Sequence, residues 1–515
     1  MNKYLKDIFI HLDGVAMTPI YEFLTNKSLS NHILINDLKK GIFRIEHKKE
    51  ASLNEGYWSV LAKILKAQNI VKKNSSKDSY GEYYNLTNYG KEVLLGDFNY
   101  SGIKNYYTLA INLIEKKLSI TDSAFSHSFD HIYSIYLDSI KKTGVDSLIS
   151  KHLEGALIAP ILIYYKYTTS KDINSRTKEV QNFLEKINFL KNKELTDKGN
   201  YLLSKSYAYG VTDSYMRTFI HLEEICLNLN SKGVAYKTDK NKKELHVDRA
   251  LNVWGSGHSH STYFKHIDNY VIDIFNKPID RQPKGIADMG CGDGAFLHHL
   301  NDLIKNKTLR GKHLNSHPLI LIGADFNQAA LDETHKMFTN NKNKPLTVLA
   351  DISKPKEYAE LVKSKYSLNI IDFLNVRSFL DHNRRFEEIS PQNNSQEYDF
   401  RNVTSNAFSW RGKAISSHEI QTNLVDHFKK WKEYISKYGL LVLELHSINI
   451  NDIYNHIGKV PMTAYLATHG FSDQFIIEYN VYKECLEIAG LNVNEKYEKI
   501  FPNMDTKMIS INLIN

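Results

Sequence analysis

The chain has 515 residues, of which 42% are apolar and 24% are charged, and its formal net charge is +8 at pH 7. This length predicts two or three domains, and the composition is typical of a globular protein. No apolar run approaches the roughly 20 residues that a membrane span needs, and the N-terminus lacks a signal-peptide core. The three cysteines form neither a disulfide framework nor a metal-ligand pattern, so we expect a cytoplasmic protein that does not enter a membrane.

Residues 1–105 are predicted to form a first domain that is mostly helical and ends in a small β unit. Apolar residues at helical spacing occupy 56–65, and two short β-prone runs within 69–86 predict a hairpin. A further helix follows, with Thr87 or Asn88 as its N-terminal cap. Helices followed by a two-stranded wing resemble a winged-helix domain.

A sequence pattern of this first domain occurs a second time. The pattern L-T-[ND]-x-G-x-x-[VL]-L begins at Leu86 and again at Leu195, which predicts a second winged-helix-like region within 106–235. No helix of either region is rich in Lys and Arg, and the surplus lysines are scattered, so we expect no nucleic-acid partner. Covering an active site or forming a homodimer is the favoured role, and DNA binding is the competing interpretation.

A polar stretch at 231–243 predicts the boundary of a third domain, 236–515. Near its start, the small and polar residues GSGHSHSTYF occupy 255–264. His258 and His260 have the H-x-H spacing that can hold a metal. The favoured interpretation is a loop with hydrogen-bonding histidines.

The stretch 285–297 organises this third domain. A short apolar run ends at Asp288, and glycines follow at alternate positions, Gly290, Gly292 and Gly294, before a helical pattern begins. Glycines let the backbone bend sharply and approach a ligand closely. The spacing D-x-G-x-G-x-G resembles motif I of class I S-adenosylmethionine (SAM) methyltransferases. The resemblance implies that Asp288 and the three glycines line the amino-acid part of SAM.

Two further predicted strands end in an acid. The apolar run 319–326 ends at Asp325 and Phe326, and an acid at the end of a second strand can accept both ribose hydroxyls of an adenosine cofactor. A third run ends at Asp351 and Ile352, where the methyltransferase family binds adenine. Three strands that end in acids predict an α/β fold with the Rossmann-like seven-stranded sheet of class I methyltransferases.

Charged and titratable residues gather after the fourth predicted strand. This strand spans 367–375 and ends at Asn375, where the family exposes the SAM methyl group. Arg377, Asp381 and His382 follow closely, a concentration of charge that is typical of a functional site. The alternative is a solvated loop with an internal ion pair.

A fifth strand, 439–446, is predicted to bring His446 to the same edge, because the carboxyl ends of parallel strands face one crevice. The polar insertion 390–411 is expected to cover the site, and 497–513 is expected to form a final antiparallel hairpin. The candidate catalytic residues are Arg377, Asp381, His382 and His446.

The motifs RSFLDHNR, HGFSDQ and GSGHSHSTYF beside DMGCGDG resemble the methyltransferase domains of polyketide assembly lines, in particular the apratoxin type, over roughly 250–515. The resemblance implies polyketide biosynthesis by carbon methylation of a malonyl-type acyl group, as a small molecule or on a carrier protein. It also implies an iron or manganese centre with His, Asp and Gln ligands, for which His469 is a further position. The predicted metal set is Asp381, His382, His446 and Gln474.

Other functions stay open from the residues alone. His382 or His446 could serve as the general base of a metal-free O- or N-methyltransferase. A DNA amino-methyltransferase would carry N/D-P-P-Y/F where this chain has Asn375-Val376-Arg377-Ser378, and a cytosine C5 enzyme would need a Pro-Cys pair that the chain lacks. An RNA methyltransferase, a DNA-binding regulator and a SAM-binding protein without activity are the remaining alternatives.

Overall fold

The computed structural model describes residues 3–26, 42–46, 54–74, 81–168, 175–228, 231–235, 237–240, 244–387 and 398–515. The chain divides into two compact units. Unit 1 comprises Met1–His258, Asn406–Ile415 and Asn449–Gln474, and unit 2 comprises Ser259–Ser405, Ser416–Ile448 and Phe475–Asn515. Among the described residues, no helix combines the length and the apolar character that crossing a membrane requires.

Unit 2 is built on a seven-stranded sheet with the order β13-β14-β12-β9-β6-β7-β8. Strands β12, β9, β6, β7 and β8 run parallel, whereas β14 is antiparallel to both β12 and β13. This arrangement confirms the predicted Rossmann-like methyltransferase sheet with its final hairpin. The strands are β6 (Gly285–Met289), β7 (Ile320–Asp325), β8 (Leu346–Leu349), β9 (Leu374–Ser378), β12 (Leu440–Leu445), β13 (Lys499–Phe501) and β14 (Ile509–Ile514).

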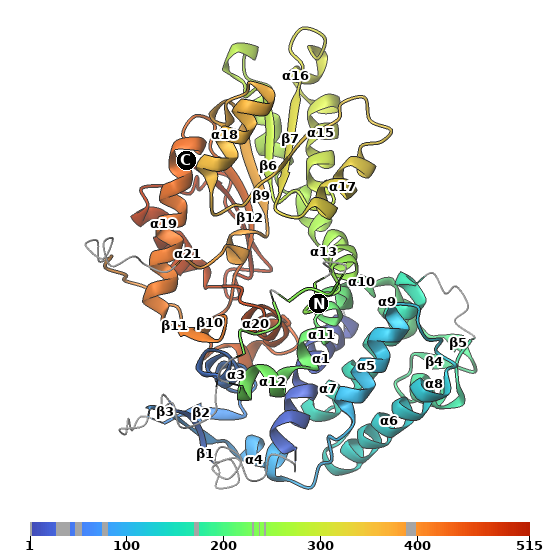
Figure 1. Cartoon of the computed structure of the whole chain (residues 1–515). Coiled ribbons are helices and arrows are strands. Elements are labelled where there is room, and N and C mark those ends of the chain that lie inside the picture. Colours follow the sequence, from blue (N-terminus) through green and yellow to red (C-terminus); the bar gives the residue numbers. More distant parts are fainter. Residues whose placement is uncertain are drawn as a thin grey trace. The chain divides into compact units, whose positions relative to one another are not determined.

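Helices cover both faces of this sheet (Figure 1). One face packs on α14 (Asp268–Phe275), α15 (Ala295–Lys307) and the end of α17 (Gln328–Met337), with a core of Ile, Leu and Phe side chains. The other face carries α18 (Pro355–Tyr366), α19 (Ser417–Ile435) and α21 (Tyr479–Ile488). Shorter elements are α16 (Leu309–Lys312), η2 (Ile279–Arg281), η3 (Ile370–Asp372) and η4 (Asp381–Asn383).

The fourth strand of the sheet lies later in the chain than predicted. Residues Ile370–Asp372 form a short 3-10 turn, and β9 begins only at Leu374. The reason is register, because Leu374 is the first residue of this segment that pairs with β6, opposite Ile286. Arg377 and Ser378 therefore belong to the carboxyl end of the strand, and Asn375 belongs to its start.

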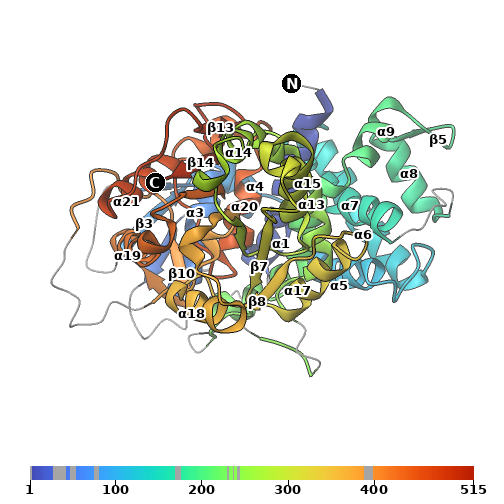
Figure 2. The same ribbon diagram turned by 90° about the horizontal axis from the view of Figure 1, so that it is seen from above.

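Unit 1 is organised around the crossing of α1 (Lys3–Thr25) and α7 (Leu148–Tyr167). The backbones come so close that a Cβ on Gly14 would lie 2.4 Å from the carbonyl oxygen of His152. Helices α5 to α9 lie together in one part of this unit (Figure 2). The further helices are α3 (Glu55–Ala67), α4 (Asn88–Leu95), α5 (Ile103–Ile114), α6 (Ser123–Thr143), α8 (Lys178–Lys186), α9 (Asp197–Ser204), α10 (Tyr207–Ser214), α11 (Met216–Phe219), α12 (Leu222–Leu227), α20 (Met462–Gly470) and η5 (Ile453–His456).

Small antiparallel sheets accompany these helices. The strands β1 (Ile42–Glu46), β3 (Gly81–Leu86) and β2 (Val71–Lys73) form one sheet in that order, which confirms the hairpin predicted over 69–86. The others are two-stranded, β4 (Leu190–Lys191) with β5 (Glu194–Leu195) and β10 (Phe408–Trp410) with β11 (Lys413–Ile415).

The repeated sequence pattern forms the same local structure twice. The Thr87 hydroxyl donates to the Asn69 carbonyl at 2.6 Å, and the Thr196 hydroxyl donates to the Asn188 carbonyl at 2.6 Å. Each threonine also caps the helix that follows it, α4 or α9, by accepting a backbone N–H. The repeat is thus a repeat of structure, whereas the winged-helix resemblance stays a prediction.

The segment GSGHSHSTYF is helical rather than a loop. It forms the second half of α13 (Arg249–Phe264), whose earlier residues up to His258 belong to unit 1. Helical hydrogen bonding explains the difference, because small polar residues cost only a few tenths of a kcal/mol each in a helix, and about 1 kcal/mol for glycine. His258 bonds within its own helix, with Nδ1 2.9 Å from the Trp254 carbonyl oxygen.

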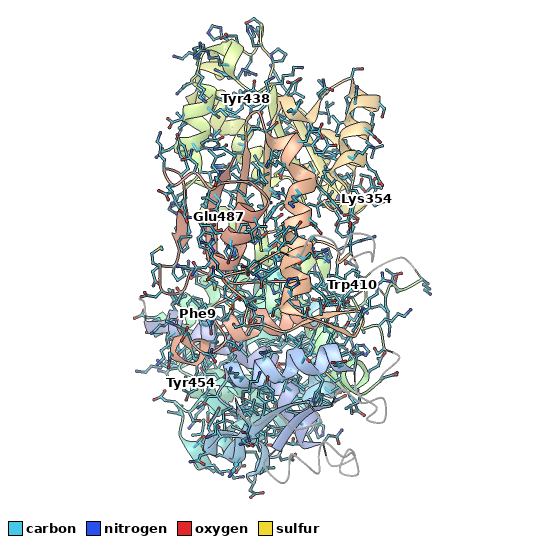
Figure 3. The ribbon with its side chains drawn as sticks, turned by 90° about the vertical axis from the view of Figure 1, so that its left-hand side faces the viewer. Phe9, Lys354, Trp410, Tyr438, Tyr454 and Glu487 are labelled. Atoms are coloured by element: carbon cyan, nitrogen blue, oxygen red, sulfur yellow. The ribbon has the colours of Figure 1, made fainter. Side chains whose placement is uncertain are left out.

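Two insertions of the predicted third domain belong to unit 1, so the boundaries at 105 and 235 differ from the observed division. The β10–β11 hairpin, where Figure 3 labels Trp410, packs on α3, and the Gly56 N–H donates to the Gly412 carbonyl at 2.9 Å. The second insertion carries α20, where the Ala464 N–H donates to Asp13 Oδ1 at 2.9 Å. These residues complete unit 1 because they satisfy buried polar groups of α1 and α3.

The insertion 390–411 is divided as well. Residues 388–397 lie outside the described part of the chain. In unit 2, Glu484 of α21 accepts the backbone N–H groups of Arg401 and Asn402 at 2.7 and 2.8 Å. Arg401 also pairs with Glu487 of the same helix at 2.9 Å, the residue labelled in Figure 3. Whether this segment covers the site stays a prediction.

Candidate active site

The glycine turn after β6 is held against β7. The N–H groups of Gly290 and Cys291 both donate to the Ala324 carbonyl, at 2.7 and 3.0 Å. Gly292 has a positive φ of 56°, and a Cβ placed there would meet no atom within 4 Å. The turn therefore presents bare backbone to open space, which suits close approach of a ligand.

Asp288 lies at the carboxyl end of β6 and is 1% exposed. Neither of its carboxylate oxygens has a hydrogen-bond partner among the described residues. Burial, together with the charges of Asp325 and Asp293, raises the pKa of Asp288 to about 8. An unpartnered buried acid is costly, so it points to a positively charged group or a hydrogen-bond donor that completes the site.

Asp325 lies at the end of β7 and is held in place by two backbone groups. Oδ2 accepts the Gly292 N–H at 3.2 Å, and Oδ1 accepts the Asn327 N–H at 2.9 Å. The next residue, Phe326, is 58% exposed although it is large and apolar. A fixed acid beside an exposed ring matches the ribose and adenine groups of an adenosine cofactor.

Asp351 follows β8 and is also fixed. It accepts the Ser353 N–H at 2.9 Å and lies 3.6 Å from Nε of Arg385. The carbonyl of its neighbour Ile352 accepts the indole N–H of Trp431 at 2.9 Å. The residues that follow β8 are therefore held by the segment after β9, through Arg385, and by α19, through Trp431.

Asn375 is the one predicted cofactor residue that the structure contradicts. It is buried at the start of β9, away from the carboxyl edge of the sheet. Its amide donates to backbone carbonyls, including that of Tyr434 at 3.1 Å. The prediction took Asn375 as the end of the fourth strand, whereas the strand begins only one residue before it. Its hydrogen bond to the Tyr434 carbonyl instead ties the end of α19 to the sheet.

Arg377 and Asp381 form a buried ion pair, with Nη1 to Oδ1 at 2.6 Å and exposures of 0% and 1%. The guanidinium lies over the ring of Trp431, and the second oxygen of Asp381 accepts the Tyr482 hydroxyl at 2.7 Å. His427 also lies 3.4 Å from Asp381. Burial opposes ionisation, but the charge of Arg377 and the contacts of His427 and Tyr482 together outweigh it and lower the pKa of Asp381.

This pairing favours a positioning role over the catalytic roles predicted for Arg377 and Asp381, which stay predictions. Asp381 is held by Arg377 Nη1 and by the Tyr482 hydroxyl of α21, whereas Arg377 Nε and Nη2 have no hydrogen-bond partner among the described residues. Arg384 strengthens the same segment by donating to the Asp381 carbonyl at 3.0 Å and to the Asn423 side chain at 2.8 Å. The internal ion pair of the alternative interpretation is present, but it is buried, whereas that interpretation expected a solvated loop.

His382 is oriented by Glu444, a residue that the sequence interpretation missed. His382 Nδ1 lies 2.6 Å from Glu444 Oε1, and the other oxygen of Glu444 accepts the Asp381 N–H at 2.6 Å. Glu444 also accepts the Leu445 N–H at 2.7 Å and is 1% exposed. A signal was present, because Glu444 is a lone acid inside the apolar strand 440–445, and a buried acid needs a partner.

His446 directly follows β12, as predicted, and is fully buried. Nε2 lies 2.7 Å from the Ser510 hydroxyl, whereas Nδ1 has no hydrogen-bond partner among the described residues. The rings of Tyr479 and Tyr482 both lie 5.0 Å away. Burial and the nearby His382 lower the pKa of His446 to about 3, so the imidazole is neutral.

Gln474 and His469 belong to unit 1, unlike the other predicted metal ligands. The Gln474 amide donates to the Tyr215 hydroxyl at 3.1 Å, and His469 Nδ1 lies 2.7 Å from the Tyr465 carbonyl oxygen. Within the described part of the chain, no three His, Cys, Asp or Glu side chains are grouped as metal ligands. The metal set thus stays a prediction.

A methyltransferase family model described as "AprA MT2-like domain" matches residues 244–512, which is more than half of the chain. The chain belongs to this family. It is a class I SAM-dependent methyltransferase, in agreement with the sheet and the glycine turn. The unpartnered Asp288 and the open space above Gly292 fit the cofactor of this family.

Solved structures with a similar chain path are distant. An O-methyltransferase family protein from Burkholderia thailandensis has 10% identity and a TM-score of 0.37, and the match covers 83% of this chain and 98% of that one. The CurJ carbon methyltransferase has 10% identity and a TM-score of 0.31, with 80% and 98% covered. No curated protein matches the chain. At these scores the structural likeness adds nothing to the family assignment.

Proposed function

We propose that this methyltransferase transfers the SAM methyl group to the α-carbon of a malonyl-type thioester, with His382 as the general base. The acyl group is a small-molecule thioester or is carried by a carrier protein, as in polyketide assembly. The observation that supports the proposal most is the 2.6 Å contact between His382 and Glu444. It supports the assignment of a base to the segment that follows the strand facing the cofactor.

In this proposal the ends of β6, β7 and β8 hold the cofactor. Asp288 accepts a hydrogen bond from the ammonium group of SAM, which gives its buried carboxylate a partner. Asp325 accepts the ribose hydroxyls, Phe326 packs against the adenine, and Asp351 accepts the adenine amino group. The glycine turn passes beneath the amino-acid part of SAM.

The orientation of the His382 ring decides which of its nitrogens acts as the base. We assign the ring proton of His382 to Nδ1, where Glu444 accepts it, so that the lone pair is on Nε2. Nε2 takes the α-proton, and the carboxylate of Glu444 stabilises the imidazolium that forms. SAM needs little further help, because its sulfonium is already a good leaving group, and the site must only align the carbanion with the methyl group.

Iron or manganese is the alternative activator. When bound, a divalent metal chelated by a dicarbonyl stabilises the enolate as a Lewis acid. The predicted set does not fit such a centre as a whole, because Asp381 already holds Arg377 and Tyr482. Withdrawing Asp381 would leave the buried Arg377 charge unpaired, at a cost of about 3–5 kcal/mol. We therefore derive no step through a metal.

Deuterium exchange into the α-carbon tests the base directly. The probe is a malonyl N-acetylcysteamine thioester in D₂O, with S-adenosylhomocysteine in place of SAM, and methyl transfer from SAM is measured separately by mass spectrometry. His382→Gln should lower both rates by about 10²–10⁴-fold, as expected for loss of a general base, and Glu444→Gln should lower them less.

The matched control is His313→Gln, an exposed histidine of unit 2 outside the site, which should behave as wild type. Unchanged exchange in His382→Gln would contradict the base. Stoichiometric iron or manganese in the purified protein, with activity lost on chelation, would establish the metal alternative. A product methylated on oxygen or nitrogen would support an O- or N-methyltransferase instead.

A further inference from the structure

His260 is not part of the proposed proton transfer, although it lies beside Phe379, three residues before the proposed base His382. Its ring stacks on the ring of Phe379, with centroids 3.8 Å apart and planes 19° from parallel. Both residues belong to unit 2, His260 near the end of α13 and Phe379 directly after β9. Tyr263, one turn further along α13, contacts the same ring edge-on at 6.4 Å.

The backbone at Phe379 is held in an unusual conformation. Its φ is +54°, a left-handed value that costs a non-glycine residue about 1 kcal/mol. The Phe379 N–H donates to the Leu443 carbonyl at 2.6 Å, which extends the pairing of β9 with β12. Strain that the surrounding contacts maintain marks a functional constraint, and here it aims the Phe379 ring at His260.

The next residues connect this stack with the cofactor turn and the base. The Leu380 side chain packs on the glycine turn, where a Cβ on Gly290 would come within 2.6 Å of it. His382 follows two residues later. A charge on His382 reaches His260, since it contributes to the lowered pKa of that ring. One short segment thus connects the ring on which His260 stacks with both the turn and the base.

The chemical state of His260 is that of a neutral imidazole. Burial, with a smaller contribution from His382, lowers the pKa of His260 to about 3. Neither ring nitrogen makes a hydrogen bond with any residue that the structure describes. Stacking alone orients the ring, and its N–H is left to a ligand. A neutral imidazole of this kind can polarise a carbonyl group without giving up its proton.

We propose that His260 donates a hydrogen bond to the thioester carbonyl oxygen of the acceptor while His382 removes the α-proton. The α C–H bond breaks, its proton goes to His382 Nε2, and its electron pair moves onto the carbonyl oxygen, where the His260 N–H stabilises the negative charge. The α-carbon then attacks the methyl group, and the electron pair of the broken bond returns to sulfur. This inference rests on the proposed function and names the thioester carbonyl as the group that this site recognises.

Two substitutions separate the hydrogen bond from the stacking. His260→Phe keeps an aromatic ring on Phe379 and removes the donor, whereas His260→Gln keeps an N–H donor and removes the ring. We expect His260→Phe to lower both the exchange rate and kcat by about 10²–10³-fold, the usual effect of losing one oxyanion donor. His260→Gln should recover part of this loss. SAM affinity, measured by calorimetry, should match the wild type in both variants.

His258→Phe is the matched control, because it lies on the same helix and its ring is stacked on Tyr207. It should keep wild-type rates. Wild-type exchange and kcat in His260→Phe, with exchange lost in His382→Gln, would overturn this inference and leave the proposed function intact. Weaker SAM binding in His260→Phe at unchanged kcat would also overturn it and make His260 a cofactor contact. Wild-type deuterium exchange at the α-carbon in His382→Gln would instead contradict the proposed function.

Discussion

Three acids end the first three strands of the unit 2 sheet, and each has a different set of partners. Asp325 and Asp351 accept backbone N–H groups and are fixed before any ligand arrives. Asp288 is buried with no partner among the described residues. Hydrogen bonds to the charged form keep an acid ionised, whereas burial without them favours the neutral form. The acids are thus suited to different parts of one cofactor.

The first prediction concerns Asp325. Asp325→Ala removes the proposed acceptor of the ribose hydroxyls and should weaken SAM binding by roughly 2–4 kcal/mol, as expected for charge-assisted hydrogen bonds lost in a closed site. Calorimetric titration measures the change. Asp332→Ala, an exposed acid on the neighbouring helix α17, is the control and should bind SAM as wild type does. Equal affinity in a folded Asp325→Ala protein would contradict the assignment of β7.

At the scale of elements, strand β12 brings together groups that are distant in sequence. Glu444 and His446 are two residues apart, so both project to the same side of the sheet. Glu444 fixes the backbone and the side chain of the segment after β9, and His446 contacts Ser510 of β14. Strand β12 thereby couples its two neighbours, β9 and β14, at the edge where the chemistry is proposed.

The second prediction concerns Asp13, a buried acid of α1 that is hydrogen-bonded to α20. Asp13 accepts the Ala464 N–H at 2.9 Å and the Gln68 amide at 3.4 Å. Burial raises its pKa to about 8. Between about pH 4 and pH 8 the folded chain therefore holds a proton that the unfolded chain has lost, so this group makes stability fall as the pH rises through that window.

Asp13→Asn should remove this dependence. The new amide can donate to Gln68 Oε1, which has no partner among the described residues. We expect the free energy of unfolding in urea to fall less between pH 5 and pH 8, by up to about 1.4 kcal/mol per pH unit. Asp97→Asn, at an exposed acid of unit 1, should retain the wild-type slope. A wild-type slope in Asp13→Asn would show that Asp13 is ionised in the folded protein.

At the scale of the whole molecule, the chain leaves the methyltransferase unit twice and returns. The excursions are Asn406–Ile415 and Asn449–Gln474, and both are part of unit 1. They bond to α3 through Gly412 and to α1 through Ala464. Unit 1 is therefore discontinuous, and the repeated local structure around Thr87 and Thr196 is only part of it.

The third prediction follows from this discontinuity. A fragment of residues 1–258 lacks both excursions, so buried polar groups such as Asp13 lose their partners and apolar faces of α1 and α3 become exposed. We expect this fragment to unfold without a cooperative thermal transition and to bind a hydrophobic dye, unlike the full chain. Circular dichroism and dye fluorescence measure both. A sharp transition in the fragment would show that residues 1–258 fold alone.

The sequence by itself determined the parts whose causes are local. Apolar runs that end in acids, with glycines at alternate positions after the first, predicted β6, β7, β8 and the glycine turn correctly, because strand period and turn chemistry depend on neighbouring residues. The helix cap at Thr87 and its repeat at Thr196 followed from the same kind of local pattern. The family resemblance over the third domain is confirmed by the family model.

Only the tertiary structure decided how the polar cluster is used. Asp381 pairs with Arg377 four residues away, yet the partners that make this pair structural, Trp431 and Tyr482, are distant in the chain. Glu444 meets His382 across 62 residues. Periodicity carries no information on such contacts, because which of several charged groups finds a buried partner depends on the packing of strands and helices around it. That packing made Asp381 the partner of Arg377 and let Glu444 orient His382, two of the residues predicted as metal ligands.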